Sequence, residues 1–460
     1  MSKATRRSFL TSAAAGAATV AAAPLVWTPR RARAQSSSFG AAEHVMILFA
    51  RGGLRSHCMF NAVGTPQHNP FGRLTDAAPS DWRPGALLGS TDYDTSLGLV
   101  PATSKITGDI AVVACVDHVP SSPVADTDHG TAGNRIGTGA PLGTTGILSL
   151  IGKDHPRYAS GFGTNAVPPV EIGQSSFGAG AAEYAAARPL SLVETNRSFL
   201  RALEVGKGWK IQARNAMNLK LRERRAPALH PRLSAFISSK RYATIFADML
   251  SAARLDVLGD AAATDAGVTN EQLLSVLGNY NLDSLGDSEP RKGWGADVAK
   301  ALRFFSFGAP MAVVTKNLYD THDNERRNLP PRAADLSRQL AGLNFLLKRM
   351  SHPRGGTYWE RTVVVVVSEF SRNNTTETGF NSGNGSDHVT RDAGPCRNQA
   401  IAFMGGPVKA GGQRIGATDE AMNATGEVFS TRSLLSTFLS LVGVDHTKYW
   451  TDPPIDDLFT

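Results

Sequence analysis

The sequence predicts an α/β protein built on a mostly parallel central sheet. Its 460 residues, 42% hydrophobic and 19% charged, have the composition of an ordinary globular chain. Six apolar, β-branched runs read as strands. They are continuously hydrophobic where a half-exposed strand would alternate, which favours parallel strands covered by helices on both faces. The runs begin at His44, Ile110, Pro169, Pro310, Thr362 and Gln399.

Helical patterns lie between and after these runs. In residues 332–350, leucines recur every three or four residues, and Pro330 and Pro331 stand where the helix would start, because a missing N–H costs little there. A second helix is expected over residues 431–443 and ends at Gly443, a residue type common just beyond helix ends.

One segment interrupts the alternation of strands and helices. Residues from about 190 to 300 are polar, rich in Arg, Lys and Ala, helical in pattern and without a clear strand. We interpret them as a helical insertion on the sheet and not as a separate domain. The mature chain, residues 35–460, is therefore expected to be a single α/β domain.

The chain opens on a twin-arginine targeting segment. Paired arginines in "TRRSFL" precede an Ala/Gly-rich apolar run, and "ARA" at 32–34 fits the small-x-small cleavage pattern. We expect residues 1–34 to be removed, leaving no stable membrane anchor. The twin-arginine export machinery would then deliver a folded protein to the periplasm or the exterior. An uncleaved anchor helix is the alternative, which is disfavoured because Ala and Gly provide little hydrophobic drive.

The positive charge of the chain belongs mostly to this leader. Residues 1–34 hold six Lys and Arg and no acid, so removing them from the formal net charge of +8 leaves about +2. A protein that binds the phosphate backbone needs its own excess of Lys and Arg. We therefore expect no nucleic-acid partner.

The three cysteines, Cys58, Cys115 and Cys396, are far apart in the chain and none has C-x-x-C spacing. In an oxidising compartment they allow at most one disulfide within the monomer. The spacing supports neither a thiolate zinc site nor a redox motif.

Acidic and histidine side chains follow the ends of the predicted strands. In an open α/β sheet, ligands bind beyond the carboxyl ends of the strands, so groups from distant segments can meet in one small volume there. Mixed carboxylate and imidazole ligands suit Zn²⁺, Mn²⁺ or Fe²⁺ better than a calcium cage of oxygens. The candidates are Asp320, His322, Glu369, Asp387, His388, Asp117, His118, Asp128 and His129.

Each of these groups also has a purely structural interpretation. An Asp-x-His at a strand end, as in Asp320 and His322, is more often a turn in which Asp caps the next helix. Glu369, after five valines, can be the first solvated residue beyond its strand, and Asp387 and His388 can form a surface turn. The joint placement of several ligand-like groups at strand ends favours the metal site over these alternatives.

Four motifs, taken in order, resemble those of the DUF1501 family of exported proteins, which is similar in turn to the alkaline phosphatase and sulfatase superfamily. They are "LYDTHDN", "VVVVVSEFSR", "GSDH" and "FMGGPVKAGGQRIG", and the resemblance extends over about residues 41–444. It implies an alkaline phosphatase-like three-layer sandwich with a mostly parallel central sheet. It also implies a divalent metal, expected to be Zn or Mn, held by Asp320, His322, Glu369, Asp387 and His388.

The chain departs from the family's pattern at two places. After the first-strand Arg-Gly-Gly, where the family has Asp or Asn, it carries Leu54 and Arg55. An arginine would repel a second cation, and Arg55 could bind a substrate anion bidentately. Where many relatives have Ser-His, this chain has Asp128 and His129, and an Asp can be a metal ligand or a nucleophile. The stretch 405–412, "GGPVKAGG", is expected to be a tight structural turn before an edge strand.

Two functions remain open. The first is metal-assisted hydrolysis of a phosphate or sulfate ester, on a small molecule or a polymer, with Asp128, His129 and Arg55 as the catalytic candidates. Thr127 or Thr131 could replace Asp128 as the nucleophile, and Arg51 could replace Arg55. The second is a non-catalytic exported binding or envelope protein on a degenerate alkaline phosphatase-like fold. The changed residues favour this alternative, and the retained metal-type residues oppose it.

Overall fold

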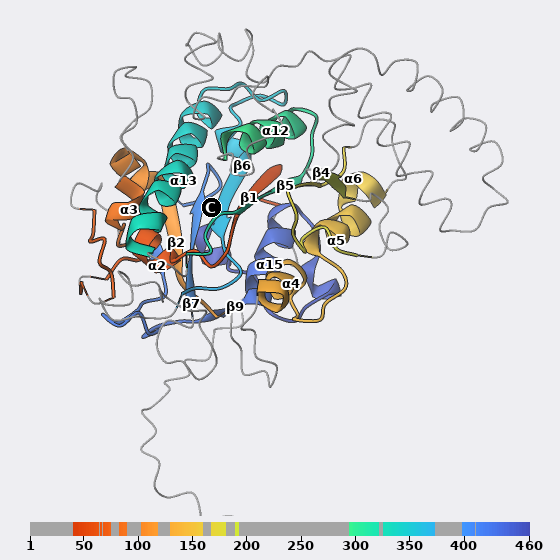
Figure 1. The fold of residues 1–460 in the computed structure, drawn as a ribbon. Coiled ribbons are helices and arrows are strands. Elements are labelled where there is room, and N and C mark those ends of the chain that lie inside the picture. The colour runs from red at the N-terminus through yellow and green to blue at the C-terminus, as the bar shows by residue number, and fades with distance from the viewer. Residues whose placement is uncertain are drawn as a thin grey trace, which may run out of the picture. The chain divides into compact units, whose positions relative to one another are not determined.

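The structure is a computed structural model, and it describes residues 40–63, 65–66, 68–74, 82–89, 103–117, 129–159, 167–180, 189–192, 294–321, 325–372, 398–409 and 411–460. Ser37–Thr460 form one compact unit. Its centre is a mixed sheet with the strand order β4-β3-β5-β1-β6-β7-β2-β8, and β9 pairs with β2 (Figure 1). The strands are β1 (His44–Arg51), β2 (Ile110–Asp117), β3 (Val170–Ile172), β4 (Leu190–Leu192), β5 (Met311–Asn317), β6 (Thr362–Val367), β7 (Asn398–Met404), β8 (Arg414–Ile415) and β9 (Phe429–Ser430).

All six predicted strands are confirmed, and so is the mostly parallel α/β sheet. β1 pairs in parallel with β5 and β6, and β3 pairs in parallel with β4 and β5. β7 is the exception, because it runs antiparallel to both of its neighbours, β6 and β2. The sequence of β7 is continuously apolar, like those of the parallel strands. A strand buried on both faces shows no alternation of polar and apolar residues, whether it is parallel or antiparallel, so the sequence did not reveal the direction of β7.

Helices cover both faces of the sheet, which gives three layers (Figure 1). Met46, Leu48 and Ala50 of β1 pack into the core beneath α2, α3, α12 and α13. The alternate residues Val45 and Ile47 pack into the core beneath α4, α5 and α15. The helices are α2 (Ser56–Phe60), α3 (Ala86–Gly89), α4 (His129–Thr138), α5 (Ile147–Asp154), α6 (Pro156–Ala159), α12 (Gly295–Ser306), α13 (Glu325–Leu347) and α15 (Thr431–Leu441).

Both long helices were predicted, one with the wrong start. α15 ends as expected, with Gly443 at φ +77° just beyond it. α13 begins at Glu325, so Pro330 and Pro331 lie inside the helix and not at its first turn. A buried ion pair between Glu325 and Arg55 holds the additional turn in place, a tertiary contact that outweighs the local preference of proline.

The described part of the expected turn begins at Gly405, whose carbonyl oxygen accepts a hydrogen bond from the N–H of Val408, and it precedes the edge strand β8. Gly405 has φ +142°, and a Cβ there would lie 2.0 Å from the carbonyl oxygen of Thr362.

The predicted insertion falls largely outside the described residues, which include only β4 at its start and the first residues of α12 near its end. Cys396 also lies outside them, whereas Cys58 and Cys115 are described and buried. No helix among the described residues is both long and apolar enough to cross a membrane.

Candidate active site

The site lies at the carboxyl edge of three adjacent strands, β5, β1 and β6. Two glycines directly after β1 allow the chain segments that follow these strands to touch. A Cβ on Gly52, at φ +118°, would lie 2.1 Å from the backbone nitrogen of Asp320, and one on Gly53, at φ +82°, would lie 2.3 Å from the ring of Phe370. Only glycine fits this approach, because other residues rarely adopt these dihedrals and their side chains would clash.

A buried carboxylate, Glu369, is the anchor of the site. One of its oxygens accepts a hydrogen bond from the backbone N–H of Gly52 at 2.8 Å and another from His129 Nδ1 at 2.7 Å. Its second oxygen lies 3.1 Å from Ser368 Oγ, and the residue is 1% exposed. These contacts fix the carboxylate in one orientation, pointed at the imidazole.

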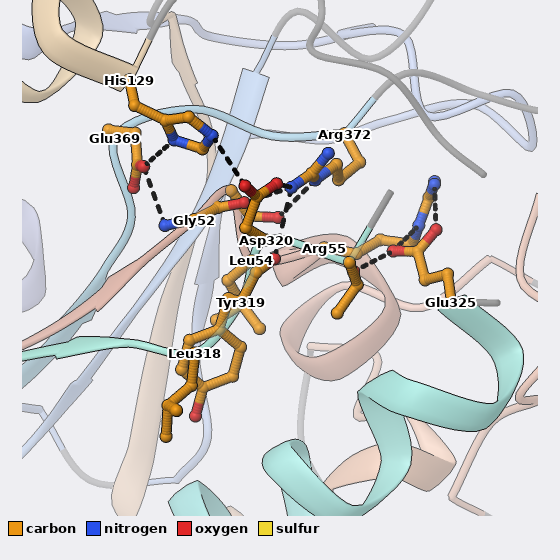
Figure 2. Close-up of polar contacts among 12 residues, drawn as sticks. Gly52, Leu54, Arg55, His129, Leu318, Tyr319, Asp320, Glu325, Glu369 and Arg372 are labelled. Carbon is orange, nitrogen blue, oxygen red and sulfur yellow. Dashed lines mark hydrogen bonds and ion pairs between the residues drawn. The ribbon is translucent and has the colours of Figure 1, made fainter. Parts of the chain in front are cut away.

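His129, the first residue of α4, lies between two carboxylates (Figure 2). Its Nδ1–H donates to Glu369, and its Nε2 lies 3.4 Å from Asp320 Oδ2. The ring also lies beside Phe370, with 5.0 Å between ring centroids. Nδ1 faces Glu369 and Nε2, on the other side of the ring, faces Asp320, so the imidazole is within reach of both carboxylates.

Asp320 joins this group to a buried arginine. Its side chain is 45% exposed, and its Oδ1 accepts a hydrogen bond from Arg372 at 2.7 Å. The Arg372 guanidinium also donates to the carbonyl oxygens of Gly52 and Gly53, so it connects the segments that follow β1, β5 and β6. Figure 2 shows the connected group from His129 through Asp320 to Arg372.

A cavity of about 430 Å³ opens beside His129 at this edge of the sheet. Its lining is a mixture of polar and apolar surface and comes from the end of β1, from α4 with the turn after it, and from the segment after β3. The polar residues that line it include Arg51, His129, Thr131, Asn134, Gln174 and Ser175. A cationic side chain and several neutral donors around a basic imidazole suit a small anionic or polyhydroxylated ligand.

Arg55 lies beside this cluster but is directed elsewhere. Its guanidinium is fully buried and makes a bidentate contact with Glu325, Nε to Oε1 at 3.1 Å and NH2 to Oε2 at 2.9 Å. A substrate anion could reach Arg55 only by displacing this carboxylate.

The sequence-based candidates divide into two groups. Three of them, His129, Asp320 and Glu369, come from distant segments and are brought together. Arg372 completes the group, and sequence reasoning missed its role although it ends the motif "VVVVVSEFSR". The remaining candidates are not part of this group. Asp117 ends β2 and lines a different cavity, and Arg55 pairs with Glu325. Five candidates lie outside the described residues: His118, Asp128, His322, Asp387 and His388.

A second cluster of ligand-type side chains lies at the opposite edge of the sheet. Among the described residues, Glu43, His44 and His352 are the group whose ligand atoms all lie within 4.8 Å of one another, so they could hold a metal ion. Burial lowers the pKa of His44 to about 4, which keeps its ring neutral at pH 7. Sequence reasoning missed this cluster because His352 is remote in the chain, although the adjacent Glu43 and His44 open a strand.

The chain matches a known family over much of its length. Residues 200–455, more than half of the chain, match the family described as a protein of unknown function, DUF1501. A search of curated proteins found no match.

Proposed function

The chain belongs to the DUF1501 family, and from that premise we propose that it is an exported, metal-dependent hydrolase of phosphate or sulfate esters. The proposal includes export by the twin-arginine route to the periplasm or the exterior and an alkaline phosphatase-like arrangement of the three layers. The observation that carries it is the Glu369–His129–Asp320 group, which lies beside the cavity at the carboxyl edge of the sheet.

The pairing of Glu369 with His129 suits proton transfer. A buried carboxylate that accepts from Nδ1–H fixes the tautomer and the orientation of the imidazole, as in other carboxylate–histidine pairs. His129 then takes a proton from the attacking group or returns one to the leaving oxygen. Glu369 acts through His129 as a positioning residue.

The ligand set that the sequence predicts suits a divalent cation such as Zn²⁺ or Mn²⁺, and Asp320 is its member among the described residues at this edge. Asp320, with its half-exposed carboxylate, would hold the ion together with the predicted ligands His322, Asp387 and His388. Such an ion supplies positive charge that polarises the ester oxygen or lowers the pKa of a water molecule.

Cationic side chains account for the choice of an anionic ester. Arg51 lines the cavity, whereas the buried Arg372 guanidinium is bound to Asp320 and to the carbonyl oxygens of Gly52 and Gly53 and acts through Asp320. Guanidinium groups match the geometry of phosphate and sulfate oxygens and stabilise charge that develops on them. The nucleophile is Asp128, which directly precedes His129, or Thr131, which lines the cavity.

The test uses the purified mature chain loaded with Zn²⁺ or Mn²⁺ and assayed on p-nitrophenyl phosphate and p-nitrophenyl sulfate. We expect turnover of at least one ester, abolished by a chelator, and a fall of about 10²- to 10⁴-fold in kcat for His129→Ala. His68→Ala is the matched control, because His68 is also partly exposed but lies away from the cavity. Absence of turnover with both metals, or equal turnover in His129→Ala and wild type, contradicts the proposal.

One observation favours a second candidate, an exported binding protein without catalysis. The carboxylate of Asp320 is already neutralised by Arg372 at 2.7 Å, a contact that competes with a metal ion. In that case the cavity binds an anionic carbohydrate or polymer and does not cleave it. A sulfated oligosaccharide that binds the wild type, binds Arg51→Gln more weakly and is recovered intact would identify this function.

A further inference from the structure

Glu43, His44 and His352 lie at the amino edge of the sheet. Glu43 and His44 open β1, and His352 lies in the tight turn between the bridged residues Ser351 and Thr357. Because β1 runs from this edge to the site of Glu369, the cluster is separated from the candidate active site by the length of the strand. Whatever it binds is independent of the proposed hydrolysis.

The distances within the cluster are those of ligands around one cation. Nε2 of His44 lies 3.3 Å from Nε2 of His352, and Nε2 of His352 lies 3.9 Å from Oε2 of Glu43. Two ligands at tetrahedral angles around zinc, each about 2.0–2.1 Å from the ion, are about 3.4 Å apart. The two imidazoles already have this separation, and the ligand atoms of all three residues lie within 4.8 Å of one another.

His44 is oriented like a metal-ligating histidine, because one ring nitrogen is fixed by a hydrogen bond to a backbone carbonyl. Its Nδ1 lies 2.7 Å from the carbonyl oxygen of Ala309, so Nδ1–H donates there and the Nε2 lone pair faces His352. The ring is stacked on Phe305, with 4.8 Å between centroids, and Tyr358 lies 5.9 Å away. This packing leaves His44 one orientation, and that orientation points its free nitrogen into the cluster.

A proton on Nε2 of His352 lies between the two imidazoles. The backbone N–H of Arg354 donates to Nδ1 of His352 at 3.2 Å, so the proton of His352 is on Nε2, between the two rings. A metal ion would displace this proton and turn the Nδ1 of His352 into a donor, which requires His352 to give up the Arg354 contact. That contact is long for a hydrogen bond, so its loss costs little.

Three arginines compete with a cation for Glu43. The Glu43 carboxylate forms ion pairs with Arg361, with Arg354 at 3.3 Å and with Arg157 at 3.4 Å. These contacts keep the carboxylate in place and ionised, and they also weaken its attraction for an added positive charge. Arg354, with a side chain 60% exposed, is the one whose removal disturbs the fold least.

We infer that Glu43, His44 and His352 form a site for Zn²⁺ or a similar divalent transition cation. Two imidazoles and a carboxylate are a preferred donor set for such ions and leave a fourth position for water. The bound ion joins the first residues of β1 to the turn that follows α13, which makes it a cross-link in the folded chain.

The first experiment counts zinc. Metal-stripped protein is titrated with Zn²⁺ alone, in competition with a chromophoric chelator, and the stoichiometry is read by native mass spectrometry. We expect His352→Ala to lose one equivalent and to bind zinc at this site at least about 100-fold more weakly. The matched control is His446→Ala, a buried histidine outside the cluster, which keeps that equivalent. Glu369→Gln also keeps it, so a failure here is distinguishable from a failure of the proposed function.

The second experiment uses the competing arginine. Arg354→Ala is expected to bind Zn²⁺ roughly 2- to 5-fold more tightly, because one cation near Glu43 is removed and the backbone N–H remains. Arg349→Ala, exposed and outside the cluster, is expected to bind as the wild type does. The inference is overturned if wild type and a folded His352→Ala bind the same number of zinc ions with the same affinity, or if the wild type binds none at micromolar Zn²⁺.

Discussion

Glu369 has almost no contact with solvent, yet it lies one contact away from the cavity. Its oxygens are held by Gly52 and Ser368 and directed at Nδ1 of His129. A carboxylate in such a position does not meet a ligand itself. It determines which nitrogen of the imidazole carries the proton and in which direction the other nitrogen points.

Glu369→Gln keeps the shape of this side chain and removes its charge. We expect kcat/KM for the better ester to fall about 10- to 100-fold, because a neutral amide holds the Nδ1–H tautomer of His129 less firmly than a carboxylate does. The melting temperature should stay close to that of wild type. Glu360→Gln, at a position remote from the cavity, provides the control in the same assay. An unchanged kcat/KM in Glu369→Gln would show that the pair does not take part in catalysis.

Removing one partner of the Arg55–Glu325 pair should cost more stability than removing both. Both side chains are 0% exposed, so removing one partner leaves an uncompensated buried charge. Arg55→Met is therefore expected to lower the free energy of unfolding by about 3–5 kcal/mol, measured by chemical denaturation. The double variant Arg55→Met/Glu325→Leu should recover much of this loss, because no buried charge remains. A double variant as unstable as the single one would contradict this account.

At the scale of the elements, the site depends on how closely the segment after β1 approaches its neighbours. Gly53 and Gly72 have nearly the same backbone conformation, φ +82° and +83°, but different surroundings. A Cβ on Gly53 would lie 2.3 Å from the Phe370 ring, whereas a Cβ on Gly72 would meet nothing within 4 Å. A comparison of the two positions therefore separates the cost of a positive φ from the cost of the steric clash with Phe370.

Substituting alanine at both glycines tests this difference. Gly72→Ala should show only the cost of a positive φ, of order 1 kcal/mol. Gly53→Ala should lose more free energy of unfolding and also reduce turnover, because the displaced Phe370 ring packs against His129. Denaturation curves and ester assays of both variants measure the two effects. Equal losses of stability, with full activity in Gly53→Ala, would exclude the collision.

At the scale of the whole molecule, a buried histidine makes stability depend on pH. His57 donates from Nε2 to the carbonyl oxygen of Asn398 at 2.8 Å, and Asn61 Nδ2 lies 3.2 Å from its Nδ1. Complete burial lowers the pKa of His57 from 6.5 to about 4. Since the unfolded chain takes up the proton first, the neutral ring stabilises the fold above pH 6.5, and this contribution is lost as the pH falls to 4.

The contribution lost over that range is on the order of 3 kcal/mol. We expect His57→Asn to show a flatter dependence of the free energy of unfolding on pH between 6.5 and 4. His68→Asn, in a partly exposed position, should keep the slope of the wild type. Parallel curves for wild type and His57→Asn would show that His57 is not the group that titrates.

The sequence predicted the sheet and its strand ends well, because long apolar runs report burial directly. It placed His129, Asp320 and Glu369 in one neighbourhood from the rule that strand ends gather at one edge, and all three are in contact there. It did not predict the partner of Arg55, because Glu325 is 270 residues away and the pair exists only in the folded chain. The direction of β7 and the start of α13 were missed for the same reason, since both depend on contacts between distant segments.

The antiparallel direction of β7 affects how the length of the chain between β6 and β7 can vary. Arg372, just after β6, and Asn398, at the start of β7, both lie on the rim that carries the cavity. Because β6 and β7 are antiparallel, the end of β6 and the start of β7 lie at one edge of the sheet, so no crossover is needed to join them. A change in the number of residues between them therefore leaves the strand order intact, and the proposed ligands Asp387 and His388, which fall in this interval, limit where such a change is tolerated.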